Sequence, residues 1–79
     1  NGREAVRIAK LAVEKSGGLQ PSILDTLAGA HAEVGHFELA VKISRRAVEL
    51  AVTKKLDRPI IDALQENLAR FEDRRPSRQ

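Results

Sequence analysis

The chain lacks cysteine, methionine, tryptophan and tyrosine altogether, and only two of its 79 residues are aromatic. The absence of cysteine excludes a disulfide framework and thiolate metal sites. No apolar run approaches the ~18 residues of a membrane span, and no signal peptide stands at the start of this segment. The default expectation is therefore a cytoplasmic location, without a membrane contact in this segment.

Glycine and proline are also scarce, and they divide the chain. The interruptions are Gly17-Gly18 with Pro21, then Gly35, then the stretch from Lys54 to Pro59. The segments between them are rich in strong helix formers, and none alternates apolar and polar residues with a period of two. We expect one all-α domain of about four helices, over residues 2–15, 21–34, 37–54 and 58–73. Either Gly17 or Gly18 is expected to close the first helix.

Apolar residues recur at helical spacing in each segment. In the first segment these residues are Ala5, Ile8, Ala9 and Ala12. Residues 21–34 carry two such stripes, which predicts a helix covered on both sides. The two stripes are Ile23, Leu27, Ala30 and Val34, and Leu24, Ala28 and His31.

The sequence repeats itself at an offset of thirty-five residues. Residues 4–14 align with residues 39–49, with six of eleven positions identical and two more exchanging one cation for the other. Ala5 and Ala12 fall on Ala40 and Ala47, so both copies place alanines seven residues apart. Helix-rich repeats of this period indicate stacked helical hairpins.

The stretch from Pro21 to Lys54 resembles one 34-residue unit of the tetratricopeptide repeat family. The residues that match that family's recurring large and small positions are Leu24, Leu27, Ala28, His31, Gly35, Phe37, Ala40 and Ala47. The resemblance implies an α-solenoid of antiparallel helical hairpins. Ser44 departs from it, because the family usually has a bulky residue there.

The resemblance also implies a division of the chain. Residues 1–16 look like the second helix of a partial repeat, residues 21–54 like one complete repeat, and residues 57–75 like a C-terminal capping helix. We expect the chain to begin inside a longer array of a bacterial type and to end where that array ends. The alternative expectation is that another chain covers the exposed face of the first helix, which would give a homo-oligomer through that face.

What the resemblance implies about function is a protein–protein interaction scaffold that binds a peptide or protein segment on its concave surface. The candidate groove residues are Ser22, Asp25, Gly29, Ala32 and Glu33. Residues 16–36 carry a net charge of −2, which favours a basic or neutral segment. Some family members hold a partner's terminal carboxylate with lysine and asparagine, but Asp25 and Gly29 stand at those positions, so no such clamp is expected.

Other functions find less support in the residues. The serines lack a base and an acid arranged for nucleophilic catalysis, so we expect no enzyme, and we expect no cofactor. His31 and His36 are five residues apart, whereas two histidines that share a metal on a helix need a spacing of four, so no metal site is predicted. Two alternatives stay open. One is a structural cap that terminates a longer array. The other, less favoured, is a nucleic-acid module that uses Arg74, Arg75 and Arg78, and it is less favoured because no aromatic residue is available to stack bases.

Overall fold

The computed structural model describes residues 2–16 and 20–74. It contains four helices, α1 (Gly2–Ser16), α2 (Pro21–Glu33), α3 (Phe37–Thr53) and α4 (Arg58–Arg74). Within the described ranges there is no strand, so the all-helical prediction is confirmed, and each predicted helix boundary is right to within one residue. The expected closure of α1 by Gly17 or Gly18 lies outside the described residues.

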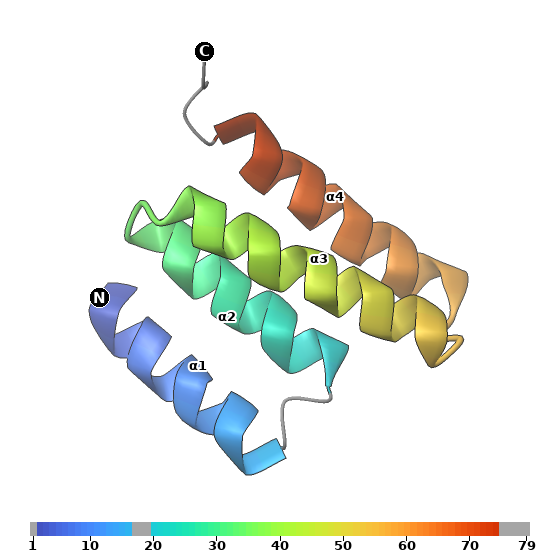
Figure 1. Cartoon of the computed structure of the whole chain (residues 1–79), viewed down its shortest axis with the longest axis horizontal. Helices are drawn as coiled ribbons and strands as arrows, with labels where there is room; N and C mark the ends of the chain where they lie inside the picture. Colours follow the sequence, from blue (N-terminus) through green and yellow to red (C-terminus); the bar gives the residue numbers. More distant parts are fainter. Residues whose placement is uncertain (1, 17–19, 75–79) are drawn as a thin grey trace.

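Helices that follow one another in sequence lie side by side and run in opposite directions (Figure 1). The α2–α3 interface is the most extensive, α3 also packs on α4, and α1 packs on α2 alone. The helices α2 and α4, which are not consecutive, touch at only a few points. The pair α2 and α3 therefore forms the centre of the molecule, with α1 on one flank and α4 on the other.

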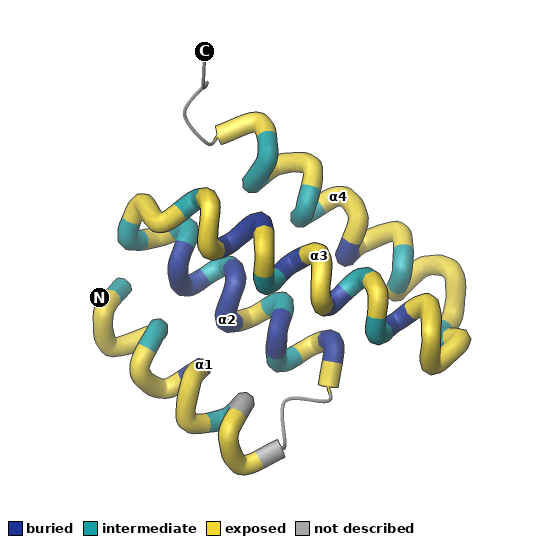
Figure 2. The backbone as a smooth tube through the Cα atoms, viewed as in Figure 1, coloured by how far each residue is buried: buried dark blue, intermediate teal, exposed yellow. Residues whose placement is uncertain are grey.

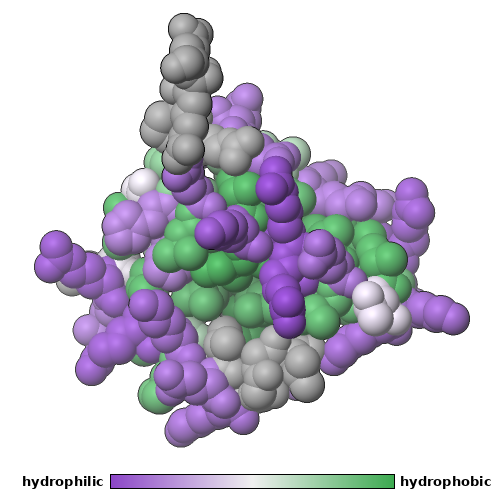
Figure 3. Space-filling view, viewed as in Figure 1, coloured by the Kyte–Doolittle hydropathy of each residue, from purple (hydrophilic) through white to green (hydrophobic). Residues whose placement is uncertain are grey.

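The core lies between α2, α3 and α4. Leu24 of α2 and Leu64 of α4 enclose Ala47 and Ala51 of α3, and half-buried apolar side chains surround this cluster. Ala47 and Ala51 have no exposed surface, and their small side chains let the neighbouring helices approach closely. Figure 2 shows the buried residues concentrated on α2 and α3. In the space-filling view, hydrophobic side chains gather over the middle of the molecule and hydrophilic ones surround them (Figure 3).

Gly35 makes the reversal between α2 and α3. Its φ of 84° is left-handed, a region in which glycine avoids the steric cost of a Cβ. The His36 N–H donates to the His31 carbonyl at 2.9 Å, and the Gly35 N–H donates to the Ala32 carbonyl at 3.0 Å. These two bonds are the Schellman arrangement that satisfies the last carbonyls of a helix.

The end of α3 uses the same arrangement without a glycine. Lys55 has a φ of 57°, and its N–H donates to the Val52 carbonyl at 3.0 Å. The Leu56 N–H donates to the Ala51 carbonyl, also at 3.0 Å. Lys55 therefore occupies the left-handed position that Gly35 occupies in the earlier turn, at a steric cost that glycine would not incur.

The apolar stripe of α1 is only partly buried. Ala9 is buried and Ala12 is half-buried, but Ala5 is exposed and Ile8 is 60% exposed. The physical reason is that α1 has one helical neighbour where α3 has two. Ala40, the repeat equivalent of Ala5, has no exposed surface because it lies in a helix covered on both flanks.

Candidate functional site

A hollow of about 350 Å³ lies between α2 and α4. It is lined by Asp25, Gly29, Ala32, Glu33, Asn67, Arg70, Phe71 and Arg74. Four of the five groove residues suggested by the sequence are therefore here. Ser22 is not among them, and is an exposed residue of the first turn of α2 whose carbonyl accepts a hydrogen bond from Thr26 Oγ1.

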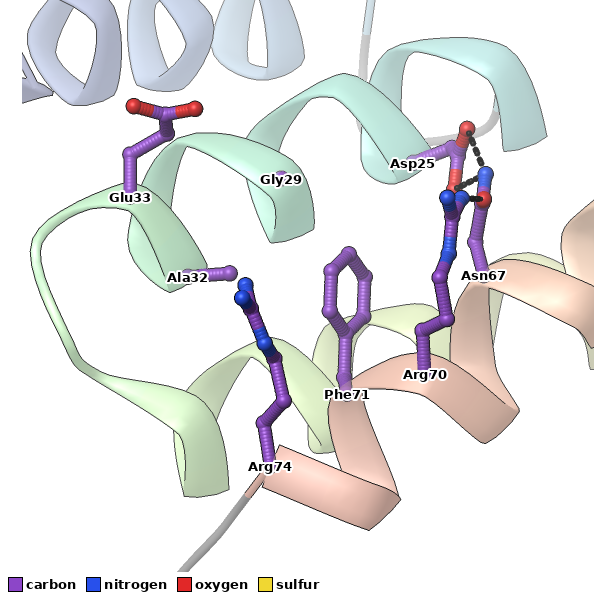
Figure 4. A pocket seen from close by; sticks show the side chains of 8 residues that line it. All are labelled: Asp25, Gly29, Ala32, Glu33, Asn67, Arg70, Phe71 and Arg74. Atoms are coloured by element: carbon purple, nitrogen blue, oxygen red, sulfur yellow. Dashed lines mark hydrogen bonds between the residues drawn. The ribbon is translucent and has the colours of Figure 1, made fainter.

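The lining follows directly from helical periodicity. On α2 the lining residues are spaced by four, three and one, and on α4 by three, one and three, so each set occupies one face of its helix. Figure 4 shows these two faces opposed, with the side chains of α4 pointing toward the α2 backbone. The α2 face could be read from the sequence, but which later helix opposes it depends on tertiary packing.

A chain of hydrogen bonds connects the two helices at one side of the hollow. Asn67 Nδ2 lies 3.1 Å from each carboxylate oxygen of Asp25, and Arg70 donates to Asn67 Oδ1 (Figure 4). Asn67 thereby has a fixed orientation, because its amide nitrogen faces an acceptor and its amide oxygen faces a donor. Asp25 is consequently a structural link between α2 and α4 as well as a lining residue.

The middle of the hollow is apolar and has free space. Phe71 is half-buried and stands between Arg70 and Arg74, with its ring toward Gly29 (Figure 4). Apart from its chain neighbours and the local backbone of α2, a Cβ at Gly29 would meet no atom within 4 Å. The absence of a side chain at Gly29 thus leaves room beside the Phe71 ring, room that an apolar group could fill.

The charge of the hollow differs from the sequence-based expectation. Asp25 and Glu33 of α2 were expected to make it acidic, but α4 adds Arg70 and Arg74. With two carboxylates and two guanidinium groups the lining has no net charge. Arg74 belongs to this hollow, while Arg75 and Arg78, the other residues of the suggested basic tail, lie outside the described residues.

The residues that carry the tetratricopeptide resemblance lie mainly at helix interfaces. Those that are buried are Leu24, Leu27, Ala28, His31, Ala40 and Ala47. Phe37 is half-buried at the start of α3, and Gly35 is the exposed left-handed residue of the turn. Ser44 is completely buried, and its Oγ has no hydrogen-bond partner within the described part of the chain.

His31 and His36 come together although their spacing does not place them on one helix face. Their ring centroids are 5.8 Å apart because Gly35 turns the chain back between them. His31 is buried, and its Nδ1 has no hydrogen-bond partner among the described residues. Burial lowers its pKa, with further lowering from the charges of Lys10 and His36. No three potential metal ligands converge anywhere in residues 2–16 and 20–74, and a pair of histidines falls short of the three or four protein ligands of a zinc site.

The chain matches no protein-family model, no curated protein and no solved structure. Across the described helices, none is long and apolar enough to cross a membrane.

Proposed function

We propose that this chain is a tetratricopeptide-like interaction module that binds a peptide segment in the hollow between α2 and α4. The observation that carries the proposal is the pairing of open space over Gly29 with the half-buried Phe71 ring, in a hollow whose lining residues also include Asp25, Glu33, Arg70 and Arg74. A site of this kind offers one apolar contact surrounded by polar groups that select a ligand.

The helix arrangement supports the solenoid interpretation. Consecutive helices pack as antiparallel neighbours, and the residues at the family's small positions, Ala28, Ala40 and Ala47, have no exposed surface. The offset of thirty-five residues relates α1 to α3, so one repeat of the array corresponds to the hairpin of α2 and α3. In such an array the first helices of successive hairpins line one groove, which assigns α2 and α4 to the same surface.

The chemistry of the lining defines the partner. The segment should carry one apolar side chain to fill the space beside Phe71, with an acidic group near Arg70 or Arg74 and a basic group near Glu33. Because the Asp25–Asn67–Arg70 chain already fixes one side of the hollow, little ordering of the host is needed on binding. The site favours a mixed-charge peptide over the basic or neutral one expected from α2 alone.

Replacing Gly29 by leucine tests the proposal. Peptides are first selected against the chain from a random display library, and their dissociation constants are measured for the wild type and for Gly29→Leu. The leucine projects into open space, so the fold is retained, and affinity should fall at least tenfold because the space for the ligand is filled. Glu49→Leu, at an exposed position of α3 outside the hollow, is the matched control and should bind normally.

Two results would reject this site. One is a library that yields no peptide binding the wild-type chain, and the other is a set of peptides whose affinity is the same for Gly29→Leu and for the wild type. Circular dichroism of each variant verifies that a loss of binding is not a loss of helix.

A second proposed role, a cap that terminates a longer array, is favoured by the surface of α4. Leu64 is its one buried residue in the described structure, while Arg58, Asp62 and Glu66 are exposed. A terminal repeat needs a polar outer face of this kind to keep the array soluble. A cap without a ligand would show no selected peptides, and removal of α4 would unfold the preceding hairpin.

A further inference from the structure

The outer face of α1 presents two exposed large apolar side chains. Ile8 is 60% exposed and Leu11 is 51% exposed, and both line a shallow hollow on the helix surface. Figure 2 shows α1 exposed along most of its length, with α2 on one side. In α3 the repeat equivalent of Ile8 is the half-buried Ile43, and that of Leu11 is the exposed Arg46. The outer face of α1 thus exposes two large apolar side chains, whereas α3 exposes none at the equivalent positions.

The charges on this face are arranged symmetrically around the two apolar residues. Glu4, Ile8, Leu11 and Lys15 are spaced by four, three and four, which places them in one stripe along the helix. All four are exposed. Read in the opposite direction the stripe has the same spacing, with the acid and the base exchanged.

We propose that this stripe pairs with the same stripe of a second copy, α1 against α1 in an antiparallel, two-fold arrangement. Rotation by the two-fold axis places Ile8 opposite Leu11 of the second copy, and Glu4 opposite its Lys15. The axis then repeats both contacts, as a symmetric dimer requires. Glu4 already accepts a hydrogen bond from Arg7 of its own helix, and a carboxylate has the capacity for a further donor.

The two flanks of the stripe differ: Arg7, Lys10 and Glu14 lie on one side of it, and small residues on the other permit close approach. Ala5 and Ala12 lie beside Ile8 on the side nearer α2, so the two helices meet no bulky group there. A parallel pairing is disfavoured, because it would place Glu4 against Glu4 and Lys15 against Lys15. Charge therefore selects the antiparallel orientation, while Ile8 and Leu11 supply the apolar contact.

The size of the surface makes the dimer a weak one. A 15-residue helix is about 22 Å long, and one helix face buries less than the roughly 1,000 Å² expected of a stable interface. We therefore expect a dissociation constant on the order of 100 µM. Association should depend on concentration and weaken with salt, because the ion pairs lie at an exposed rim.

The test is sedimentation velocity of the 79-residue chain over a concentration series up to about 500 µM, several-fold above that expected dissociation constant. Glu4→Lys and Lys15→Glu should each weaken association several-fold, since each variant places like charges opposite one another. An equimolar mixture of the two single variants should recover wild-type association, because a lysine then faces a glutamate at both ends of the mixed dimer. Leu11→Glu should leave a monomer, whereas Leu39→Glu, at an exposed position of α3, should leave association unchanged.

The proposal is overturned if the wild type stays monomeric through the series, which would leave this face to a different protein segment. It is equally overturned if Leu11→Glu still dimerises, or if the mixture of charge variants associates no better than either variant alone. Because the stripe is solvent-exposed, helix content by circular dichroism should be the same for all variants. Dimerisation through α1 is independent of peptide binding in the hollow between α2 and α4, so either proposal can fail without the other.

Discussion

Asn67 of α4 donates through Nδ2 to both carboxylate oxygens of Asp25 on α2, at 3.1 Å each. This contact spans 42 residues of sequence and joins two helices that otherwise touch at few points. It therefore sets the spacing of the hollow that we propose as the binding site. Hydrogen bonds to a charged group contribute about 1.5–3 kcal/mol when buried, and less where solvent competes.

Asn67→Ala is expected to lower the free energy of unfolding by about 1 kcal/mol, since the contact is part-buried. Asp25→Ala should have a similar effect, and the double variant should cost less than the sum, because both changes remove the same contact. Urea denaturation of the four proteins measures this coupling. Glu33→Ala, which removes an exposed carboxylate of the same hollow, should change stability by under about 0.5 kcal/mol.

Ser44→Ala is expected to stabilise the chain by about 1 kcal/mol. The Ser44 side chain is completely buried, and its Oγ has no partner among the described residues, so the hydroxyl is desolvated without compensation. The sequence itself contains the replacement, since the repeat offset places Ala9 at the equivalent position of α1. Thermal unfolding followed by calorimetry checks the effect, and a lower melting temperature for Ser44→Ala would contradict it. Ser22→Ala, at an exposed position, is the control.

Lys55→Gly should also stabilise the fold, by about 1 kcal/mol, because it relieves a left-handed conformation that costs a residue with a Cβ roughly that much. Lys54→Gly offers a matched control one residue earlier. Lys54 has a φ of −80° and a helical ψ, so glycine there relieves no strain, adds freedom to the unfolded chain and should destabilise by about 0.5–1 kcal/mol. Opposite signs for the two substitutions in chemical denaturation are the expected result, and equal signs would count against it.

Stability should fall as the pH drops below the ordinary histidine pKa of 6.5. Burial first, then the positive charge of Lys10 on α1 and the neighbouring His36, lower the pKa of His31 in the folded chain. Between the lowered folded pKa and 6.5 the unfolded chain binds more protons, so the free energy of unfolding rises with pH. The stability that depends on neutral His31 is therefore fully present above that pH window and is lost as the pH falls through it.

Comparison of melting temperatures from pH 5 to pH 8 for the wild type and His31→Phe isolates this effect. The difference between the two proteins should change across the window, because phenylalanine cannot be protonated. His36→Gln should keep most of the slope, since burial of His31 is the largest cause of its lowered pKa. A wild type and a His31→Phe variant with parallel pH profiles would contradict the assignment.

The helices could be predicted closely because their ends are marked by local chemistry. Pro21 occupies the first turn of α2, Gly35 adopts the left-handed conformation after it, and Pro59 follows the start of α4. These residues act through their own backbone preferences, which do not depend on the rest of the fold. The two buried stripes of α2 were predictable for a related reason, since apolar residues around most of a helix require neighbours on two sides.

The features that the sequence did not reveal depend on which helices meet. Ala5 and Ile8 of α1 are apolar and helically spaced, yet they are exposed because α1 packs on α2 alone. Arg70 and Arg74 enter the hollow only because α4 folds back beside α2. The sequence does place Asn67, Arg70 and Arg74 on one face of α4. Nothing in the local sequence, however, predicts that this face lies opposite Asp25.

The proposed function requires that the hollow between α2 and α4 receives a peptide. Backbone amide chemical shifts of the 15N-labelled chain, followed during titration with a selected peptide, test it most directly. We predict that the largest changes occur at Gly29, Ala32, Asn67 and Phe71, with Glu49 and Val52 on α3 unchanged. Largest changes on α3 or on the outer face of α1, with those four amides unaffected, would contradict the proposed function.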